Sequence, residues 1–157
     1  MADIIPNIFM KDQAEKKIDF PNDNMKLALF NGIYDACGLR DVLSYDQIAS
    51  HEVAPLYGYP QGGFSVHGKS VTIDDTTNEV VYDMNDVIMT VSGGTFGPTR
   101  YGVVYNLSYA NHIVYVFDFI EDKTVNDGAQ FAIKIDTNGL MKARQLLSCS
   151  CDTTTGC

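Results

Sequence analysis

The chain has 157 residues, of which 45% are apolar, and a formal net charge of −9. That length is typical of one domain that buries roughly two-thirds of its unfolded surface, and the apolar share is ordinary for a globular protein. The acidic balance and the scattered basic residues argue against nucleic acid as a partner, and no apolar run approaches the roughly 18 residues of a membrane-spanning helix.

Residues 1–22 predict an N-terminal arm with a short helix. The stretch NIFMKDQAEKKID (7–19) has a thin apolar face on which Ile8 and Phe9 point inward, and Pro21 breaks the helix. Because no charged segment precedes an apolar core, we expect no secretory signal and a cytoplasmic site of synthesis and assembly.

The next segment mixes one strand with irregular structure. KLALF (26–30) predicts a strand, and SYDQIAS (44–50) predicts one or two helical turns with Ser44 as a cap. APLYGYPQGGF (54–64) is dense in Gly, Pro and Tyr, which indicates a loop.

From residue 64 onward the apolar residues alternate with polar ones, as in strands. A hairpin is expected from SVTID (70–74) and EVVYD (79–83), and the loop SGGTFGPT is expected at 92–99. Further strands are expected at 86–91, 100–107, 112–119 and 130–136, with a last one in LMKARQLL (140–147). Strands 100–107 and 112–119 are apolar on both faces, so they are central or one face is covered by a partner.

This spacing favours a mainly β fold, namely a single-domain antiparallel β-sandwich of the jelly-roll kind. The domain is expected to span 23–147, followed by a flexible Cys-rich tail at 148–157.

No pattern of catalytic residues emerges, so we expect neither an enzyme nor a cofactor or metal. His51, His67 and His112 stand apart in sequence, and H-E-x-x-H fails because Pro55 takes the place of the second histidine. The acidic pair at Asp74 adjoins a turn, where Asp is common for backbone reasons.

The tail SCSCDTTTGC holds three of the four cysteines, Cys149, Cys151 and Cys157. Their spacing does not match a tetrahedral zinc site. A flexible or partner-ordered tail is the first interpretation, and interchain disulfides are the second.

Aromatic residues are abundant, with nine Tyr, eight Phe and no Trp. Tyr57, Tyr59 and Phe64 bracket the Gly-Pro loop. Tyrosine suits protein interfaces and sugar stacking, and it also serves to fill a β core.

Short motifs follow one another in an order that resembles small virion proteins of tailed bacteriophages. The segments that carry the resemblance are N-I-F at 7–9, NMKLAL at 24–29, HEV at 51–53, GYPQGG at 58–63, VYDMNDV at 81–87, RYGVVY at 100–105, DF at 118–119 and FAI at 131–133. Two features depart from that family: Ile88 and Met89 stand where a Trp often follows D-V, and the Cys-rich tail is extra.

The resemblance implies a non-enzymatic virion protein, assembled in the host cytoplasm. The favoured role is a capsid decoration or cement protein that bridges major capsid subunits, often as a homotrimer. Alternatives are a head–tail connector, baseplate or fibre-anchoring component, and a carbohydrate-binding module with Tyr57, Tyr59 and Tyr101 as its stacking platform.

On this interpretation the important residues form an interface with another virion protein. They are expected in the loop 57–64, the loop 92–100 and the arm 4–9. The candidates are Ile4, Ile8, Phe9, Tyr57, Tyr59, Phe64, Phe96, Arg100 and Tyr101.

Overall fold

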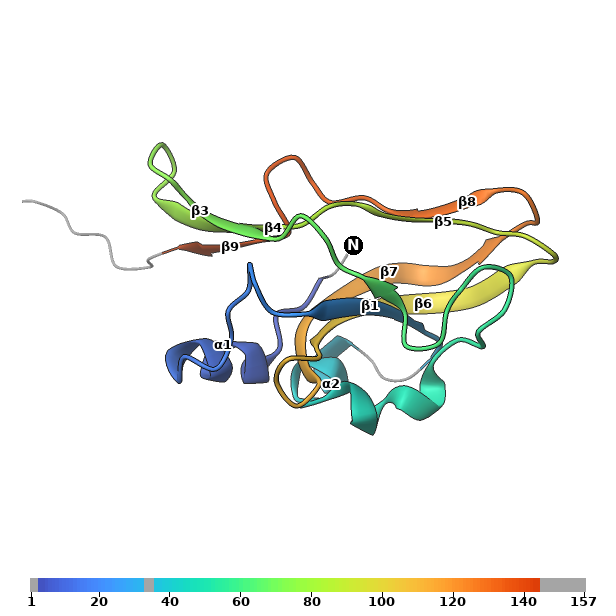
Figure 1. Cartoon of the computed structure of the whole chain (residues 1–157), viewed down its shortest axis with the longest axis horizontal. Coiled ribbons are helices and arrows are strands. Elements are labelled where there is room, and N and C mark those ends of the chain that lie inside the picture. Colours follow the sequence, from blue (N-terminus) through green and yellow to red (C-terminus); the bar gives the residue numbers. More distant parts are fainter. Residues whose placement is uncertain (1–2, 33–35, 145–157) are drawn as a thin grey trace, which may run out of the picture.

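The computed structural model describes residues 3–32 and 36–144 (Figure 1). Its helical elements are α1 (Asn7–Ala14), α2 (Ala36–Arg40) and two 3-10 turns, η1 (Tyr45–Gln47) and η2 (Ala49–His51). The strands are β1 (Met25–Phe30), β2 (Phe64–Ser65), β3 (Ser70–Asp74), β4 (Glu79–Asp83), β5 (Val87–Thr90), β6 (Phe96–Asn106), β7 (His112–Val125), β8 (Gln130–Ile133) and β9 (Met141–Arg144).

The described strands form three antiparallel sheets, so the prediction of a mainly β fold is confirmed. Four strands pair in the order β2-β1-β6-β7, three in the order β3-β4-β9, and β5 pairs with β8. In the largest sheet Val103 lies opposite Val116 and Ala28 lies opposite Val103.

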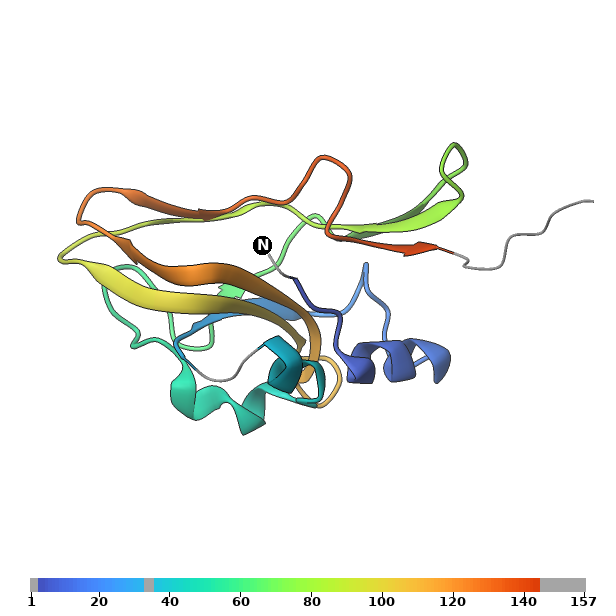
Figure 2. The same ribbon diagram turned by 180° about the vertical axis from the view of Figure 1, so that it is seen from behind.

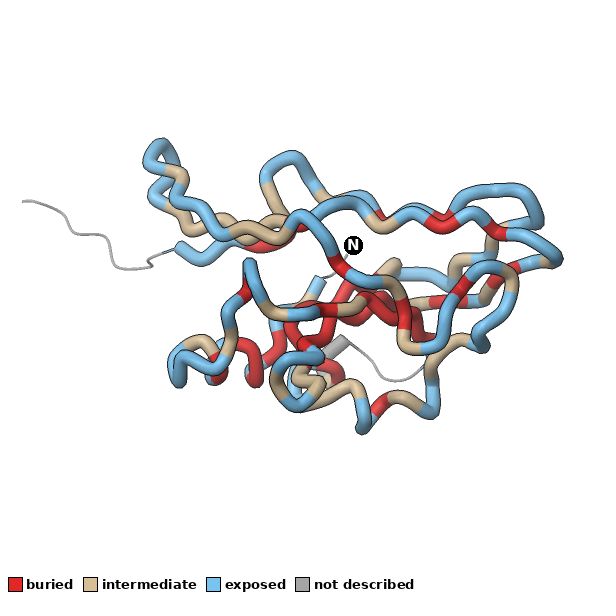
Figure 3. Tube along the Cα trace, in the orientation of Figure 1, coloured by how far each residue is buried: buried red, intermediate tan, exposed pale blue. Residues whose placement is uncertain are grey.

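The four-stranded sheet lies between two layers. The β5–β8 ribbon lies along one side of it, and α1, α2 and the 3-10 turns lie on the other (Figures 1 and 2). Buried residues concentrate on the strands of the middle layer (Figure 3). This layering places the core on both faces of one sheet.

Strand alternation explains the two core clusters. In β1, Leu27 and Leu29 pack into the cluster beneath the β5–β8 ribbon, whereas Ala28 and Phe30 pack into the cluster on the helical side. The helical side contributes Ile8, Leu39 and Ile48 to the second cluster. The chain's own helices therefore cover the second apolar face.

The N-terminal helix is shorter than the sequence predicts. Ile8 and Phe9 are buried, as expected, but α1 ends at Ala14, five residues before the predicted end. Lys16 adopts φ +57°, a left-handed conformation that does not continue a right-handed helix.

Most predicted strands are confirmed, with corrections at β8 and along the β6–β7 hairpin. The strand predicted over 130–136 ends at Ile133, and residues 145–147 of the last predicted strand lie outside the described residues. The prediction of a loop over 92–99 is wrong from Phe96 onward, because Phe96 pairs with Val125 and is buried. The same pairing extends β7 beyond its predicted end at 119. Register shifts between Phe96 and Tyr101 accommodate the Gly-Pro pair that the sequence analysis placed in a loop. Helix α2 was not predicted.

Candidate interaction surface

The Tyr-rich loop 54–64 is held by a single carboxylate, that of Glu52. Its Oε1 accepts hydrogen bonds from the Tyr59 hydroxyl at 2.6 Å and the Gly62 N–H at 2.8 Å. Its Oε2 accepts from the Tyr45 hydroxyl at 2.6 Å and from Gln61 at 2.7 Å. Three of the donors lie in the second half of the loop and the fourth, Tyr45, lies in η1, so Glu52 ties that half of the loop to the 3-10 turn.

The tyrosines around Glu52 form a hydrogen-bonded cluster in which Tyr59 and Tyr105 are buried and Tyr45 is half-buried. The Tyr59 hydroxyl, while donating to Glu52, accepts the Leu29 N–H at 2.9 Å. The Tyr45 and Tyr105 rings stack with centroids 4.4 Å apart, and Tyr105 donates to the Gly62 carbonyl at 2.7 Å. These hydroxyls therefore act as hydrogen-bond donors that position the loop.

Burial raises the pKa of each of these hydroxyls. It raises the pKa of Tyr105 to about 12 and moves the pKa values of Tyr45 and Tyr59 further above the ordinary value, with the Glu52 carboxylate adding to the effect. At neutral pH all three remain protonated donors. Such groups hold structure and are poorly suited to act as nucleophiles or bases.

The Gly-Gly pair of the loop allows a close approach to β1. Gly63 has φ +84°, and a Cβ at this position would lie 2.0 Å from the Leu27 carbonyl oxygen. Any side chain would push the loop away from the sheet.

The two predicted interface loops meet at Tyr57. The Ser92 N–H donates to the Tyr57 carbonyl at 3.1 Å, and a Cβ on Gly94 would lie 2.3 Å from the Tyr57 ring. Leu56 beside it is 53% exposed. Leu56, Tyr57, Gly93 and Gly94 make one surface, which we call the Tyr57 surface.

An ion pair joins β6 to β7. The Arg100 Nε donates to Asp118 Oδ1 at 2.7 Å, and Asp118 is buried and also accepts the Ile120 N–H at 2.8 Å. Burial acts to raise the pKa of Asp118, but Arg100 and the Ile120 N–H outweigh it and hold that pKa below its usual value. Arg100 also lies over the Tyr101 ring, 5.5 Å from its centroid.

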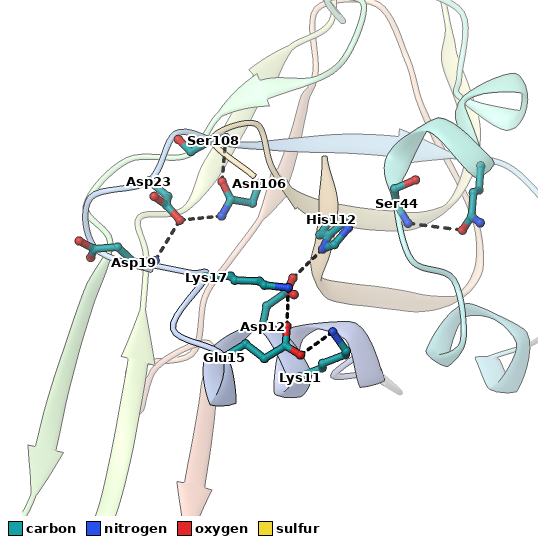
Figure 4. Close-up of polar contacts among 11 residues, drawn as sticks. Lys11, Asp12, Glu15, Lys17, Asp19, Asp23, Ser44, Asn106, Ser108 and His112 are labelled. Carbon is teal, nitrogen blue, oxygen red and sulfur yellow. Dashed lines mark hydrogen bonds and ion pairs between the residues drawn. The ribbon is translucent and has the colours of Figure 1, made fainter. Parts of the chain in front are cut away.

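The N-terminal arm is part of the chain's own fold. Ile4 pairs with Val116 through two backbone hydrogen bonds of 2.9 and 3.0 Å, which cover the outer edge of β7. The Asp12 carboxyl group of α1 shares a hydrogen bond of 2.7 Å with His112 Nδ1 on β7 (Figure 4). This bond ties α1 to the same strand. Both contacts tie the arm to β7 of the same chain.

The structure divides the nine predicted interface side chains into two groups. Ile8, Phe9, Tyr59, Phe96 and Tyr101 are buried in the chain's own core. Ile4, Tyr57, Phe64 and Arg100 are half-buried and reach the surface. The predicted sugar platform is not assembled as a surface, because Tyr59 and Tyr101 are both covered.

The histidines and the Asp74 carboxylate, considered in the sequence analysis as metal or catalytic candidates, have separate surroundings. His51 and His67 are exposed, and His112 pairs with Asp12. Across residues 3–32 and 36–144, histidines, cysteines and carboxylates do not gather in a group of three that could hold a metal ion. Asp74 accepts the N–H groups of Thr76 and Thr77, as its predicted turn role requires.

Two further predictions concern the cysteines of the C-terminal tail and the absence of a membrane-spanning helix. Cys149, Cys151 and Cys157 lie outside the described residues. Among the helices of the described part, none has the length and apolar character needed to span a bilayer.

Sequence reasoning missed the exposure of the β3–β4–β9 sheet. This sheet extends away from the middle layer (Figure 1), and Ile73 on β3 is 72% exposed. The alternation in SVTID predicts the strand, but a strand pattern does not reveal which of its faces the rest of the chain leaves open.

Comparisons with protein-family models, with curated proteins and with solved structures find no match for this chain.

Proposed function

We propose that the chain is a non-enzymatic structural protein of a bacteriophage particle that is assembled in the host cytoplasm. Within the particle, its proposed role is that of a decoration protein that bridges major capsid subunits of the shell. The proposal begins from the ordered motifs in the sequence. In the structure, motifs that follow one another along the chain contact each other through side-chain hydrogen bonds between residues 7 to 18 positions apart.

Two contacts carry this argument. Glu52 of HEV accepts hydrogen bonds from Tyr59 and Gly62 of GYPQGG. Arg100 of RYGVVY forms an ion pair with Asp118 of DF. The motifs thus contact one another as parts of the fold, and the structural role is proposed from the family resemblance that these motifs carry.

The β arrangement fits the same proposal. We take the finer architecture to be a jelly-roll-like sandwich, in which the β5–β8 ribbon covers the β6–β7 hairpin. Such a body is rigid, and its acidic surface favours solubility before assembly. Many copies on a symmetric shell bind through avidity even when each contact is weak.

The Tyr57 surface is one part of the predicted interface that remains accessible. It joins both predicted loops, and it places the exposed apolar side chain of Leu56 beside Tyr57, a residue type enriched in protein interfaces. We propose that this surface contacts the major capsid protein.

Cosedimentation with capsid shells that lack the protein tests this proposal. The wild-type chain is expected to bind, and Leu56→Asp is expected to weaken binding at least about tenfold because it places a charge in the contact. Leu43→Asp is the matched control, since Leu43 is 48% exposed on a different segment. No binding by the wild-type chain, or equal binding by both variants, would count against the Tyr57 surface as the contact.

A further inference from the structure

Strand β3 is an open edge of the extended sheet. The order β3-β4-β9 leaves one side of β3 without a neighbouring strand in the described chain, and the backbone hydrogen bonds from other described segments do not reach it. In an antiparallel pair, alternate residues direct their N–H and C=O groups away from the partner strand. β3 therefore presents a row of such groups to solvent.

The usual protection of an edge strand is weak here. Edges are commonly blocked by proline, by a bulge or by a charged residue in the middle of the strand. β3 has the sequence SVTID, with its single charge at the end, and its five residues pair with β4 in one continuous register. This edge is regular and open to another strand.

The apolar side chains of β3 lie on one face. Val71 is 38% exposed and Ile73 is 72% exposed, and strand alternation places both on the same side of the sheet. Val71 lies opposite Tyr82 of β4, and the Tyr82 ring packs edge-on against Phe9 and Phe20. The apolar face thus continues from the core of the chain to its open edge.

Opposite charges flank this apolar pair. Lys69 precedes β3 and Asp75 follows it, so the sequence runs from a cation through Val71 and Ile73 to an anion. Lys69 donates to the Val66 carbonyl at 3.3 Å, and within the described residues neither Lys69 nor Asp75 forms an ion pair. When two copies of β3 lie antiparallel, the positive end of each strand lies beside the negative end of the other.

We propose that β3 pairs with β3 of a second copy of this chain, antiparallel and about a two-fold axis at Thr72. In this register Val71 faces Ile73 of the second copy twice, and Lys69 lies across from Asp75 twice. The two three-stranded sheets join into one continuous sheet, and the interface is isologous.

Neighbouring registers are less favourable. Moving the axis to Val71 places Ile73 opposite Lys69, and moving it to Ile73 places Val71 opposite Asp75. A shift that pairs odd with even positions puts the two apolar faces on opposite sides of the sheet. The axis at Thr72 alone combines both apolar pairs with both charge pairs.

The expected dimer is weak. A standard interface buries about 800 Å² per partner, and a five-residue edge supplies less than that, so we expect a dissociation constant on the order of 10–100 µM. This dimer does not depend on the proposed function, and it differs from the trimer that the family resemblance implies.

Sedimentation velocity of the full chain, with reductant present to keep the tail cysteines from bridging, tests the proposal. Between roughly 5 µM and 1 mM we expect a monomer–dimer equilibrium with a dimer of about 35 kDa, twice the 17.3 kDa of the chain. Ile73→Lys is expected to raise the dissociation constant at least about tenfold, because two lysines would then face the joined edge. The matched control is Ile88→Lys on β5, where Ile88 is 50% exposed, and it is expected to leave association unchanged.

Charge reversal tests the register. Lys69→Glu and Asp75→Lys should each weaken the dimer several-fold by placing like charges across the axis, and the double variant should restore it. A chain that stays monomeric at 1 mM, a trimer of the wild-type chain, an Ile73→Lys variant that associates like wild type, or a double variant no better than the single ones would each overturn the proposal.

Discussion

Replacing Glu52 with alanine removes the acceptor of four hydrogen bonds at once. Two of the donors, the Tyr59 hydroxyl and the Gly62 N–H, lie on the loop side that packs against β1. The other two, Tyr45 and Gln61, are closer to solvent and can donate to water in the variant.

The expected cost follows from which donors lose their partner. Leaving a buried donor without an acceptor costs about 1–3 kcal/mol, and solvent-accessible donors cost little. With two donors affected, Glu52→Ala should lower the free energy of unfolding by about 2–6 kcal/mol. For a chain of this length that corresponds to a fall in Tm of roughly 4–24 °C.

Thermal and urea unfolding followed by circular dichroism measures this change. Glu121→Ala is the matched control, because the Glu121 side chain is 73% exposed and pairs with Lys123 on the surface. Its removal should leave the free energy of unfolding nearly unchanged. If Glu52→Ala costs no more than Glu121→Ala, the carboxylate does not hold the loop and the reasoning fails.

Two further predictions test other parts of the fold. Gly63→Ala should lower the free energy of unfolding by more than about 3 kcal/mol, because the new Cβ would meet the Leu27 carbonyl. The control Gly128→Ala should cost about 1 kcal/mol, because Gly128 also has a positive φ, +80°, but open space around it. Equal costs in urea unfolding would contradict the close approach of Gly63 to β1. Asp118→Asn should cost about 1–2 kcal/mol at pH 7. The pKa of Asp118 is lower in the folded chain than in the unfolded chain, where it is about 3.9. The stabilisation by ionised Asp118 is therefore present above about pH 3.9 and is lost as the pH falls through the folded pKa. The difference in free energy of unfolding between wild type and Asp118→Asn should narrow below about pH 4. A gap that does not change with pH would contradict the ion pair.

The strands were largely predictable because their pattern is local. The hairpin of β3 and β4 and the strands β5 and β8 follow period-two alternation that a short window reveals, and β1 is a short run that is apolar on both faces. The β6–β7 extension was not predictable in this way. Phe96 is followed by a Gly-Pro pair typical of a turn, and only its pairing with Val125 makes it a strand residue.

The interface residues were harder to predict for a related reason. Tyr59 in a Gly-Pro loop has the same sequence signature whether its ring fills the core or faces a partner. Its burial depends on Glu52 and on the backbone of Leu29, which the loop meets only in the folded chain. The contact of Arg100 with Asp118 likewise depends on the β6–β7 register, in which Tyr101 lies opposite Asp118.

The most direct test of the central claim is the copy number of this chain in purified phage particles, measured by quantitative mass spectrometry against the major capsid protein. A decoration protein should be present in hundreds of copies per particle and should remain through density-gradient purification. A few copies per particle would place it in a connector or baseplate instead, and its absence from particles would contradict a structural role in the virion.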